Sequence, residues 1–138
     1  MDETLSDLLK NQNQLNIKKL FTDILKSVLQ LHEHYVIHRD IKPANIMLSH
    51  STGIMKVIDY GMAKEIEFED RPMTNEVGSL YYRAPELLLG SKRYDFSVDV
   101  WSLGCVFYEM LTRKVLFKGE NQLDQVKKIF KVTGTPKS

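Results

Sequence analysis

The sequence has few of the features that mark secreted, membrane or nucleic-acid-binding proteins. Its 138 residues include one cysteine, Cys105, which cannot form an internal disulfide, so a secreted fold stapled by disulfides is disfavoured. The net charge is only +1, from 19 basic and 18 acidic residues, which gives no electrostatic case for nucleic acid or an anionic membrane. No signal peptide is visible, and no apolar run approaches the ~18 residues of a membrane helix. We therefore expect an intracellular protein, cytoplasmic or nuclear, with no nucleic acid and no membrane as partner.

What is present is ordinary for a globular domain. Hydrophobic residues make up 43% of the chain and charged residues 27%, which argues against a disordered or low-complexity sequence. A chain of this length buries roughly two thirds of its surface on folding. We therefore expect one domain over residues 1–138, with a core of its own and no internal repeat or linker.

Hydrophobic spacing predicts a mainly α-helical fold with one small β-hairpin. The clearest helix covers residues 17–33, where apolar side chains recur three and four positions apart and Asn16 suits the N-cap. A short helix is expected over residues 3–10. Two short apolar segments, 45–48 and 55–59, flank a run of turn residues and predict the hairpin.

The second half of the chain predicts a loop followed by helices. Residues 61–78 have no clear periodicity and carry several acidic side chains, so we expect a long exposed loop. Three helices are expected after it, over residues 84–89, 98–111 and 122–132. The middle one is apolar nearly all round, which places it in the middle of the core.

Three short polar motifs follow the long predicted helix in order. Residues 38–45 read HRDIKPAN, Asp59 begins a DYG triplet fourteen residues after Asn45, and residues 84–86 read APE. Taken singly, each motif has an ordinary structural interpretation. Asp40, Asn45 and Asp59 could be turn formers, and Arg39 could make a local salt bridge with Asp40.

Taken together, at this spacing, the motifs resemble the large, C-terminal lobe of eukaryotic protein kinases. The resemblance implies a Ser/Thr protein kinase that transfers the γ-phosphoryl group of ATP, bound with Mg²⁺, to a protein hydroxyl. In that family the counterpart of Asp40 accepts the hydroxyl proton, and that of Lys42 places positive charge at the γ-phosphate. The counterparts of Asn45 and Asp59 hold Mg²⁺ and the nucleotide phosphates through oxygen ligands. The fold implied is an incomplete kinase C-lobe.

The resemblance also assigns structural roles. His38 is a packing residue stacked against the aromatic that Tyr60 replaces, in preference to a general base. Asp99, a carboxylate in an apolar helix, accepts hydrogen bonds from the backbone around His38 and Arg39 and anchors the catalytic loop, residues 38–45. Its alternative is a carboxylate favoured by the helix dipole at an N-terminal turn. Glu86 pairs, in the family, with an arginine that would lie beyond residue 138.

The other histidines and the single cysteine give no clear indication of a functional site. His32, His34 and His50 are expected at the surface, and no two of them have the spacing of metal ligands. Cys105 lies within the apolar helix and is expected to be an inert core residue.

Residues 74–90 resemble the end of the activation loop in cyclin-dependent and mitogen-activated protein kinases. There Thr74 would be the activating phosphorylation site, with Arg39 and Lys64 pairing with its phosphate. Mitogen-activated kinases carry a tyrosine two residues later, where this chain has Glu76, which is closer to the cyclin-dependent pattern.

The same segment implies a preference among substrates. Gly78 and Ser79 would line the site for the residue after the phosphorylated Ser or Thr, and would favour proline there. A glycine reaches a left-handed backbone without penalty, and proline has no N–H to satisfy.

The 138 residues also lack parts that the family uses. They contain no Gly-rich phosphate loop, no ATP-pairing lysine on a strand and no regulatory helix with its glutamate. We therefore expect a piece of a kinase domain that is inactive by itself. Its partners would be a protein substrate and an activating kinase or cyclin-like protein. The alternative is a catalytically silent lobe fragment or pseudokinase that acts as an interaction module.

Overall fold

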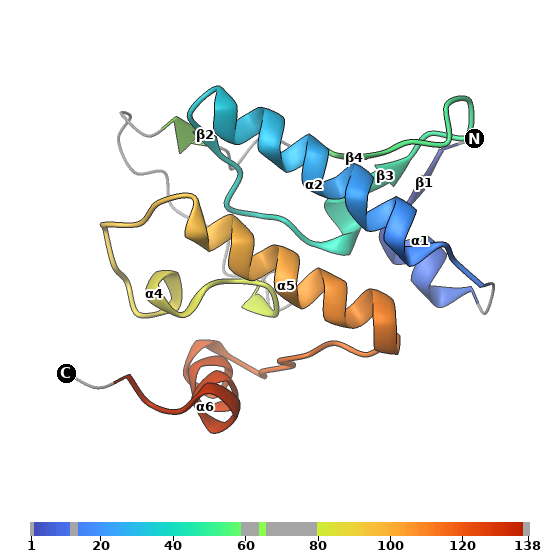
Figure 1. Cartoon of the computed structure of the whole chain (residues 1–138). Helices are drawn as coiled ribbons and strands as arrows, with labels where there is room; N and C mark the ends of the chain where they lie inside the picture. Colours follow the sequence, from blue (N-terminus) through green and yellow to red (C-terminus); the bar gives the residue numbers. More distant parts are fainter. Residues whose placement is uncertain (1, 12–13, 59–63, 66–79, 137–138) are drawn as a thin grey trace.

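The computed structural model describes residues 2–11, 14–58, 64–65 and 80–136, and they form a mainly helical structure with a little β-sheet (Figure 1). The elements are, in chain order, β1 (Glu3–Thr4), α1 (Leu5–Lys10), α2 (Ile17–Glu33), β2 (Val36–Ile37), η1 (Pro43–Asn45), β3 (Ile46–Leu48), β4 (Met55–Val57), β5 (Lys64–Glu65), α4 (Pro85–Leu88), α5 (Ser97–Thr112) and α6 (Gln122–Thr133). The predicted fold class is confirmed. Within these ranges no helix has both the length and the apolar character needed to cross a membrane.

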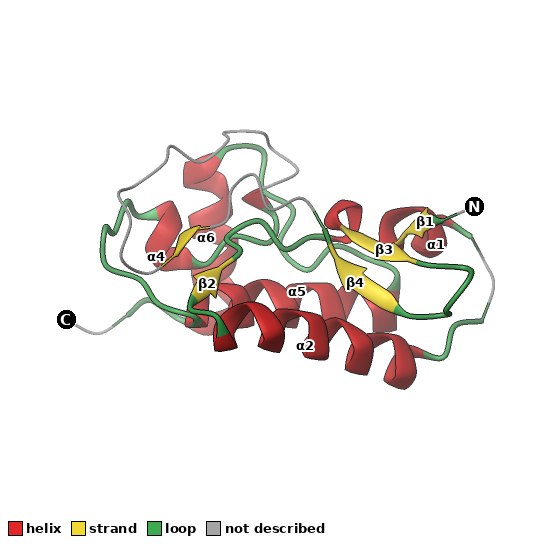
Figure 2. Ribbon diagram, turned by 90° about the horizontal axis from the view of Figure 1, so that it is seen from above, coloured by secondary structure: helices red, strands yellow, loops and turns green. Residues whose placement is uncertain are grey.

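Helix α2 forms as its hydrophobic spacing predicts. The side chain of Asn16 accepts a hydrogen bond from the Lys19 N–H at 3.2 Å and caps the helix N-terminus. Leu20, Ile24 and Val28 are buried along one stripe. Helix α5 runs beside α2 and contacts it (Figures 1 and 2). The segment that contains residues 38–45 connects to the C-terminal end of α2.

The start of the chain differs from its prediction. Thr4 has an extended backbone and caps α1 in a capping box with Asp7, so the helix begins only at Leu5. The residues before the cap are extended as well, and Glu3 and Thr4 pair antiparallel with Leu48 and Met47. The predicted hairpin of β3 and β4 is confirmed, and β1 adds a third strand in the order β1-β3-β4.

A second short sheet lies where a loop is predicted. Lys64 and Glu65 form β5 and pair antiparallel with Ile37 and Val36 of β2. The loop prediction is wrong at these two residues, because strands of two residues are too short to show an alternating pattern. The other residues of 61–78 lie outside the described part of the chain.

Helix α5 is buried on one side only, which corrects the prediction of a helix enclosed by the core. Val98, Val106 and Met110 are fully or almost fully buried. Val100 and Leu111, on other faces of the same helix, are 60% and 56% exposed. Part of the apolar surface of α5 is therefore exposed to solvent in the part of the chain that the structure describes.

A buried glutamine joins helix α6 to the segment before it. Gln125 is fully buried, its side-chain oxygen accepts the Gly119 N–H at 2.7 Å, and its side-chain nitrogen donates to the Phe117 carbonyl at 2.9 Å. The approach is close because Gly119 has no side chain. A Cβ at Gly119 would lie 2.7 Å from both the Cα and the N of Gln125.

Gly119→Ala is expected to destabilise the protein, because the backbone of α6 would have to move away from the new methyl group. Overpacking of this kind costs about 2–3 kcal/mol of unfolding free energy. Urea denaturation followed by circular dichroism measures the loss. Gly104→Ala in α5 is the matched control, since a Cβ there meets nothing within 4 Å, and it is expected to be neutral or stabilising. Equal midpoints for Gly119→Ala and the parent protein would contradict the argument.

Candidate active site

The loop after β2 and the η1 turn that follows it bring together three of the predicted site residues. The Asn45 side-chain nitrogen donates to the Asp40 carbonyl at 2.8 Å and to the Asp40 carboxylate at 3.2 Å. The Lys42 ammonium lies 3.8 Å from the same carboxylate, and both side chains are largely buried. Pro43 is the first residue of the η1 turn, and this turn places Asn45 within hydrogen-bond distance of Asp40. A carboxylate, a cation and an amide thus share one small polar site.

The arrangement leaves an oxygen available on Asn45. Its amide nitrogen is engaged by Asp40, while its side-chain oxygen makes no hydrogen bond with the described residues. Amide and carboxylate oxygens are ligands that suit Mg²⁺. Asp59 lies outside the described residues, but the N–H of Ile58 donates to the Asn45 carbonyl at 2.7 Å. In the described ranges no three His, Cys, Asp or Glu side chains form a metal-binding group of their own.

His38 is fully buried, and both of its ring nitrogens have backbone partners. Nδ1 accepts the Asp40 N–H at 3.1 Å, and Nε2 donates to the Ile58 carbonyl at 2.9 Å. These partners fix the tautomer, since an N–H can only donate and a carbonyl can only accept. The ring therefore ties the loop to the strand end and is not free to take a proton from a substrate. Tyr60, its expected stacking partner, lies outside the described residues.

Asp99, in the first turn of α5, makes the hydrogen bonds that the family resemblance implies. Its two carboxylate oxygens accept the N–H groups of His38 and Arg39, each at 2.9 Å, and the side chain is fully buried. Arg39 has a left-handed backbone, with φ of 71°. Such a conformation costs a non-glycine residue about 1–2 kcal/mol. The two hydrogen bonds that Asp99 accepts therefore support a strained stretch of backbone next to Asp40.

His32 is not a surface residue, and its prediction is wrong. Its Nε2 lies 2.8 Å from the Asp99 carboxylate, and its side chain is only 15% exposed. The ring packs against Phe96 with 4.5 Å between the ring centroids. The sequence held a signal for this position, because His32 lies four residues after the buried Val28 on the same stripe of α2. His34 and His50 are exposed, as predicted.

Arg39 has a partner that the motifs did not suggest. The guanidinium donates to the Tyr94 hydroxyl at 2.6 Å and lies over the tyrosine ring, and the arginine is almost fully buried. No sequence pattern linked these two positions. Thr74, whose phosphate Arg39 is predicted to bind, lies outside the described residues, and for Lys64 only the backbone in β5 is described.

The segment before the APE motif is hydrogen-bonded to α5 through Tyr82. The Tyr82 hydroxyl donates to the Glu109 carboxylate at 2.5 Å, and the Ser102 hydroxyl donates to the Tyr82 carbonyl at 2.6 Å. Burial raises the pKa of Glu109, and the hydrogen bond from Tyr82 opposes that rise. Gly78 and Ser79, the predicted substrate-binding residues, lie outside the described residues. The hydrogen bonds of Tyr82 to α5 come three residues after Ser79 in the chain.

Tyr82→Phe is expected to lower the unfolding free energy by about 1.5 kcal/mol at pH 7, because a half-buried carboxylate loses its donor. A raised pKa means that the folded state favours the protonated form of Glu109. The contribution of Glu109 to the unfolding free energy therefore falls as the pH rises above the pKa that this carboxyl has in the unfolded chain. The loss caused by Tyr82→Phe should therefore be larger at pH 7 than at pH 4. Glu109→Gln keeps an acceptor and should show no such pH dependence. Urea titrations at both pH values test this, and a loss independent of pH would contradict it.

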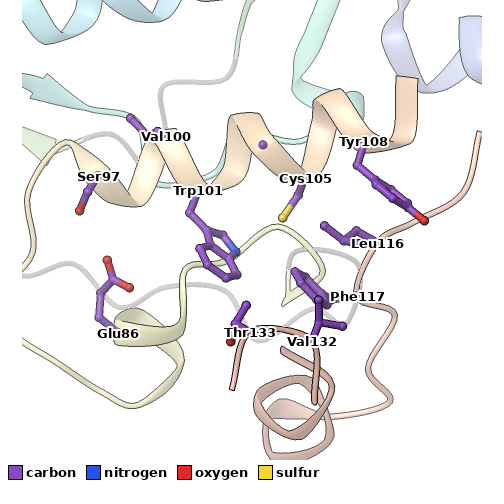
Figure 3. A pocket seen from close by; sticks show the side chains of 11 residues that line it. Glu86, Ser97, Val100, Trp101, Cys105, Tyr108, Leu116, Phe117, Val132 and Thr133 are labelled. Carbon is purple, nitrogen blue, oxygen red and sulfur yellow. The ribbon is translucent and has the colours of Figure 1, made fainter. Parts of the chain in front are cut away.

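A separate cavity of about 670 Å³ lies between α5 and α6 (Figure 3). It is lined mainly by apolar side chains, including Trp101 and Phe117, and contains none of the polar side chains of the Asp40 cluster. Glu86 lies at its edge, and its carboxylate makes no ion pair or hydrogen bond with the described residues. The buried thiol of Cys105 also faces this side, and burial raises its pKa to about 12. That value fits the prediction of an inert cysteine.

Comparisons with known proteins agree with this geometry. The whole chain, residues 1–138, matches the family model described as protein kinase domain. Cyclin-dependent kinase 11B of Homo sapiens is 48% identical over 120 residues, which cover 87% of this chain and 15% of the human protein. The Mus musculus protein of the same name is 49% identical, with the same two shares.

A solved structure shows the same fold. One chain in the crystal structure of the yeast RNA Pol II CTD kinase CTDK-1 complex superposes with a TM-score of 0.85 and 38% sequence identity. The superposition covers 98% of this chain and 45% of that chain. The 138 residues therefore span less than half of the length of each of these relatives.

Proposed function

The chain belongs to the protein kinase family, and from this premise we propose that the protein containing it transfers the γ-phosphoryl group of ATP to Ser or Thr hydroxyls of a protein. The observation that carries the proposal is the polar cluster of Asp40, Lys42 and Asn45. Phosphoryl transfer depends mainly on positioning and charge stabilisation, and these three groups, held together by hydrogen bonds and an ion pair, could supply both.

Asp40 would act as the proton acceptor for the substrate hydroxyl. Its carboxylate is oriented by the Asn45 amide and lies within 3.8 Å of the Lys42 ammonium. Lys42 would place positive charge beside the transferred group, where negative charge accumulates. His38 would not take part in proton transfer, because both of its ring nitrogens are engaged.

The residues present fit Mg²⁺ with ATP. The unbonded side-chain oxygen of Asn45 would be one ligand, and we propose Asp59 as the second. When bound, Mg²⁺ supplies charge neutralisation on the nucleotide phosphates. The contribution of this chain would be to orient the Asn45 amide by its hydrogen bonds to Asp40, which engage the amide nitrogen and not the oxygen.

The relatives point to a branch of the family. They are cyclin-dependent kinases by name, so we extend the proposal to a cyclin-like activating partner and an intracellular setting. We also propose that Gly78 and Ser79 favour proline after the phosphorylated residue. A peptide library without enrichment of proline at that position would remove this part of the proposal.

Phosphorylation of Thr74 is expected to activate the protein. A phosphate adds about −1.5 to −2 charges and can order a loop by pairing with basic residues, here Arg39 and Lys64. The complete protein should lose most of its turnover after phosphatase treatment or as Thr74→Ala. Equal turnover of the parent, the variant and the treated protein would show that Thr74 has no such role.

The test of the main proposal is transfer of labelled γ-phosphate from ATP to protein substrates by the complete protein that carries this chain. Ser/Thr labelling that depends on Mg²⁺ is expected. Residues 1–138 alone should show none, since they contain no Gly-rich loop or ATP-pairing lysine to position the nucleotide. Absence of transfer by the complete protein with its activating partner would favour the alternative, a noncatalytic interaction module.

A further inference from the structure

We propose that Tyr94 is a positioning residue for Arg39, because it holds the arginine side chain in the one orientation in which the guanidinium receives the phosphate of the activation loop. The inference rests on the proposed function in taking Thr74 as the residue that carries this phosphate. It assigns a role to a tyrosine in the segment between α4 and α5, which lies 55 positions from Arg39 in the chain.

The contact between Arg39 and Tyr94 has two components. Nη1 of the guanidinium donates to the Tyr94 hydroxyl at 2.6 Å, and the guanidinium carbon lies 5.8 Å from the centre of the tyrosine ring. Arg39 is only 5% exposed. A buried cation is costly unless electron-rich groups surround it, and a hydroxyl oxygen and an aromatic ring are two such groups. Tyr94 therefore lowers the cost of keeping the Arg39 guanidinium inside the protein.

One short stretch of chain holds both ends of Arg39. Asp99 accepts the Arg39 N–H at 2.9 Å, and Tyr94, five residues earlier, accepts a hydrogen bond from the guanidinium. The Tyr94 ring is itself packed against a small core cluster that contains Ile37 and Val98. A long arginine side chain loses much rotamer freedom when it is fixed at its tip. Attachment at the backbone and at the guanidinium therefore leaves Arg39 few orientations.

An orientation must be imposed on Arg39 because charged groups surround it. Burial lowers the pKa of the Arg83 guanidinium, the negative charge of Asp40 opposes this fall, and the positive charge of Arg39 adds to it. These three charged groups are therefore close enough to influence one another. A guanidinium that rotated freely here would be attracted to the Asp40 carboxylate next to it in the chain. Tyr94 directs the Arg39 side chain by a contact that does not involve Asp40.

The partner that holds the guanidinium is a tyrosine, and a tyrosine hydroxyl is uncharged at neutral pH. A carboxylate in this place would orient Arg39 as well, but it would also neutralise the positive charge. The hydrogen bond to Tyr94 uses one of the five guanidinium N–H groups and leaves the charge of Arg39 unchanged. A phosphate binds a guanidinium through charge-assisted hydrogen bonds, which need that charge. The contact thus suits an arginine whose ligand is an anion.

The first experiment follows the Arg39 guanidinium in the 138-residue chain by nitrogen-15 spectroscopy at low temperature. A guanidinium that is held shows separate signals for its two Nη groups, because rotation about its C–N bonds is slow. Tyr94→Phe keeps the ring but removes the acceptor oxygen. Tyr35→Phe is the matched control, because it removes a hydroxyl from a tyrosine that is 69% exposed.

The parent and Tyr35→Phe should show separate Nη signals for Arg39, and in Tyr94→Phe the rotation should become at least tenfold faster. The backbone amide of Arg39, which Asp99 holds, should exchange with solvent within about twofold of the parental rate in all three proteins. Unchanged rotation in Tyr94→Phe would overturn the proposal. An equally large rise in exchange at the Arg39 amide would also overturn it, because Tyr94 would then stabilise the whole loop and not the side chain.

The second experiment measures turnover of the complete protein, with its activating partner, before and after phosphatase treatment. In the phosphorylated protein Tyr94→Phe should lower turnover at least fivefold. After phosphatase treatment the variant and the parent should agree within about twofold. An equal loss in both states would overturn the proposal, because a merely structural role does not depend on the phosphate.

Failure of the proposed function would be recognised separately. A parent protein that phosphorylation does not activate would reject Thr74, and with it the phosphate as the ligand of Arg39. The rotation of the guanidinium requires neither ATP nor phosphate, so it would still decide whether Tyr94 holds Arg39.

Discussion

Asp40→Asn in the complete protein is expected to lower kcat for phosphoryl transfer by about 10²–10⁴-fold, the contribution typical of a positioned general base. Asparagine preserves the shape of the side chain and can still contact Asn45 and Lys42, but it cannot accept the substrate proton. The unfolding free energy should change little, because asparagine has the size of aspartate and its side-chain oxygen can still accept the hydrogen bond from the Asn45 amide. Steady-state turnover and urea denaturation of the same preparations separate the two effects.

Glu33→Gln provides the matched control for charge. It removes one carboxylate in the same way, but from the exposed last turn of α2. Its turnover should equal that of the parent. If Asp40→Asn retained turnover within a few fold of Glu33→Gln, another group would have to accept the proton, and the assignment of Asp40 would be wrong.

Asp99→Ala is expected to destabilise the protein by about 3–5 kcal/mol, a large part of the stability of a domain of this size. The change leaves the N–H groups of His38 and Arg39 buried without an acceptor, and it removes the partner of His32. It also leaves the left-handed backbone of Arg39 without its support. Urea denaturation measures the loss, and a variant too unstable to fold agrees with the prediction.

Asp95→Ala is the control for this second prediction. Asp95 lies four residues earlier and is exposed, and its side chain accepts the N–H of Ser97, the first residue of α5. Its loss should therefore have a much smaller effect than that of Asp99. An Asp99→Ala protein no less stable than Asp95→Ala would show that the buried carboxylate contributes nothing to the fold.

The features that the sequence predicted best are those that depend on residues close together in the chain. Helix α2 follows from the spacing of Leu20, Ile24 and Val28, and its predicted ends are those observed. The cluster of Asp40, Lys42 and Asn45 follows from one short segment, because a single turn at Pro43 brings the three side chains together.

Features that depend on distant partners were missed. The contact of His32 with Asp99, the pairing of β5 with β2 and the hydrogen bond of Arg39 to Tyr94 all join segments far apart in the chain. Each involves one or two residues, which is too few to leave a periodic pattern. The exposed side of α5 was missed for another reason, since a helix that is apolar all round does not say which of its sides the fold covers.

The Asp99 hydrogen bonds also set an order of events during synthesis. Residues 38–45 leave the ribosome long before α5, and the acceptor for the His38 N–H lies 61 positions later in the chain. A nascent chain that ends before α5 carries the whole HRD motif but has nothing to hold Arg39 in its left-handed conformation. The site therefore belongs among the late, long-range contacts of folding, whose loop-closure entropy slows their formation. A growing chain therefore completes the anchoring of the HRD motif only after α5 has been synthesised.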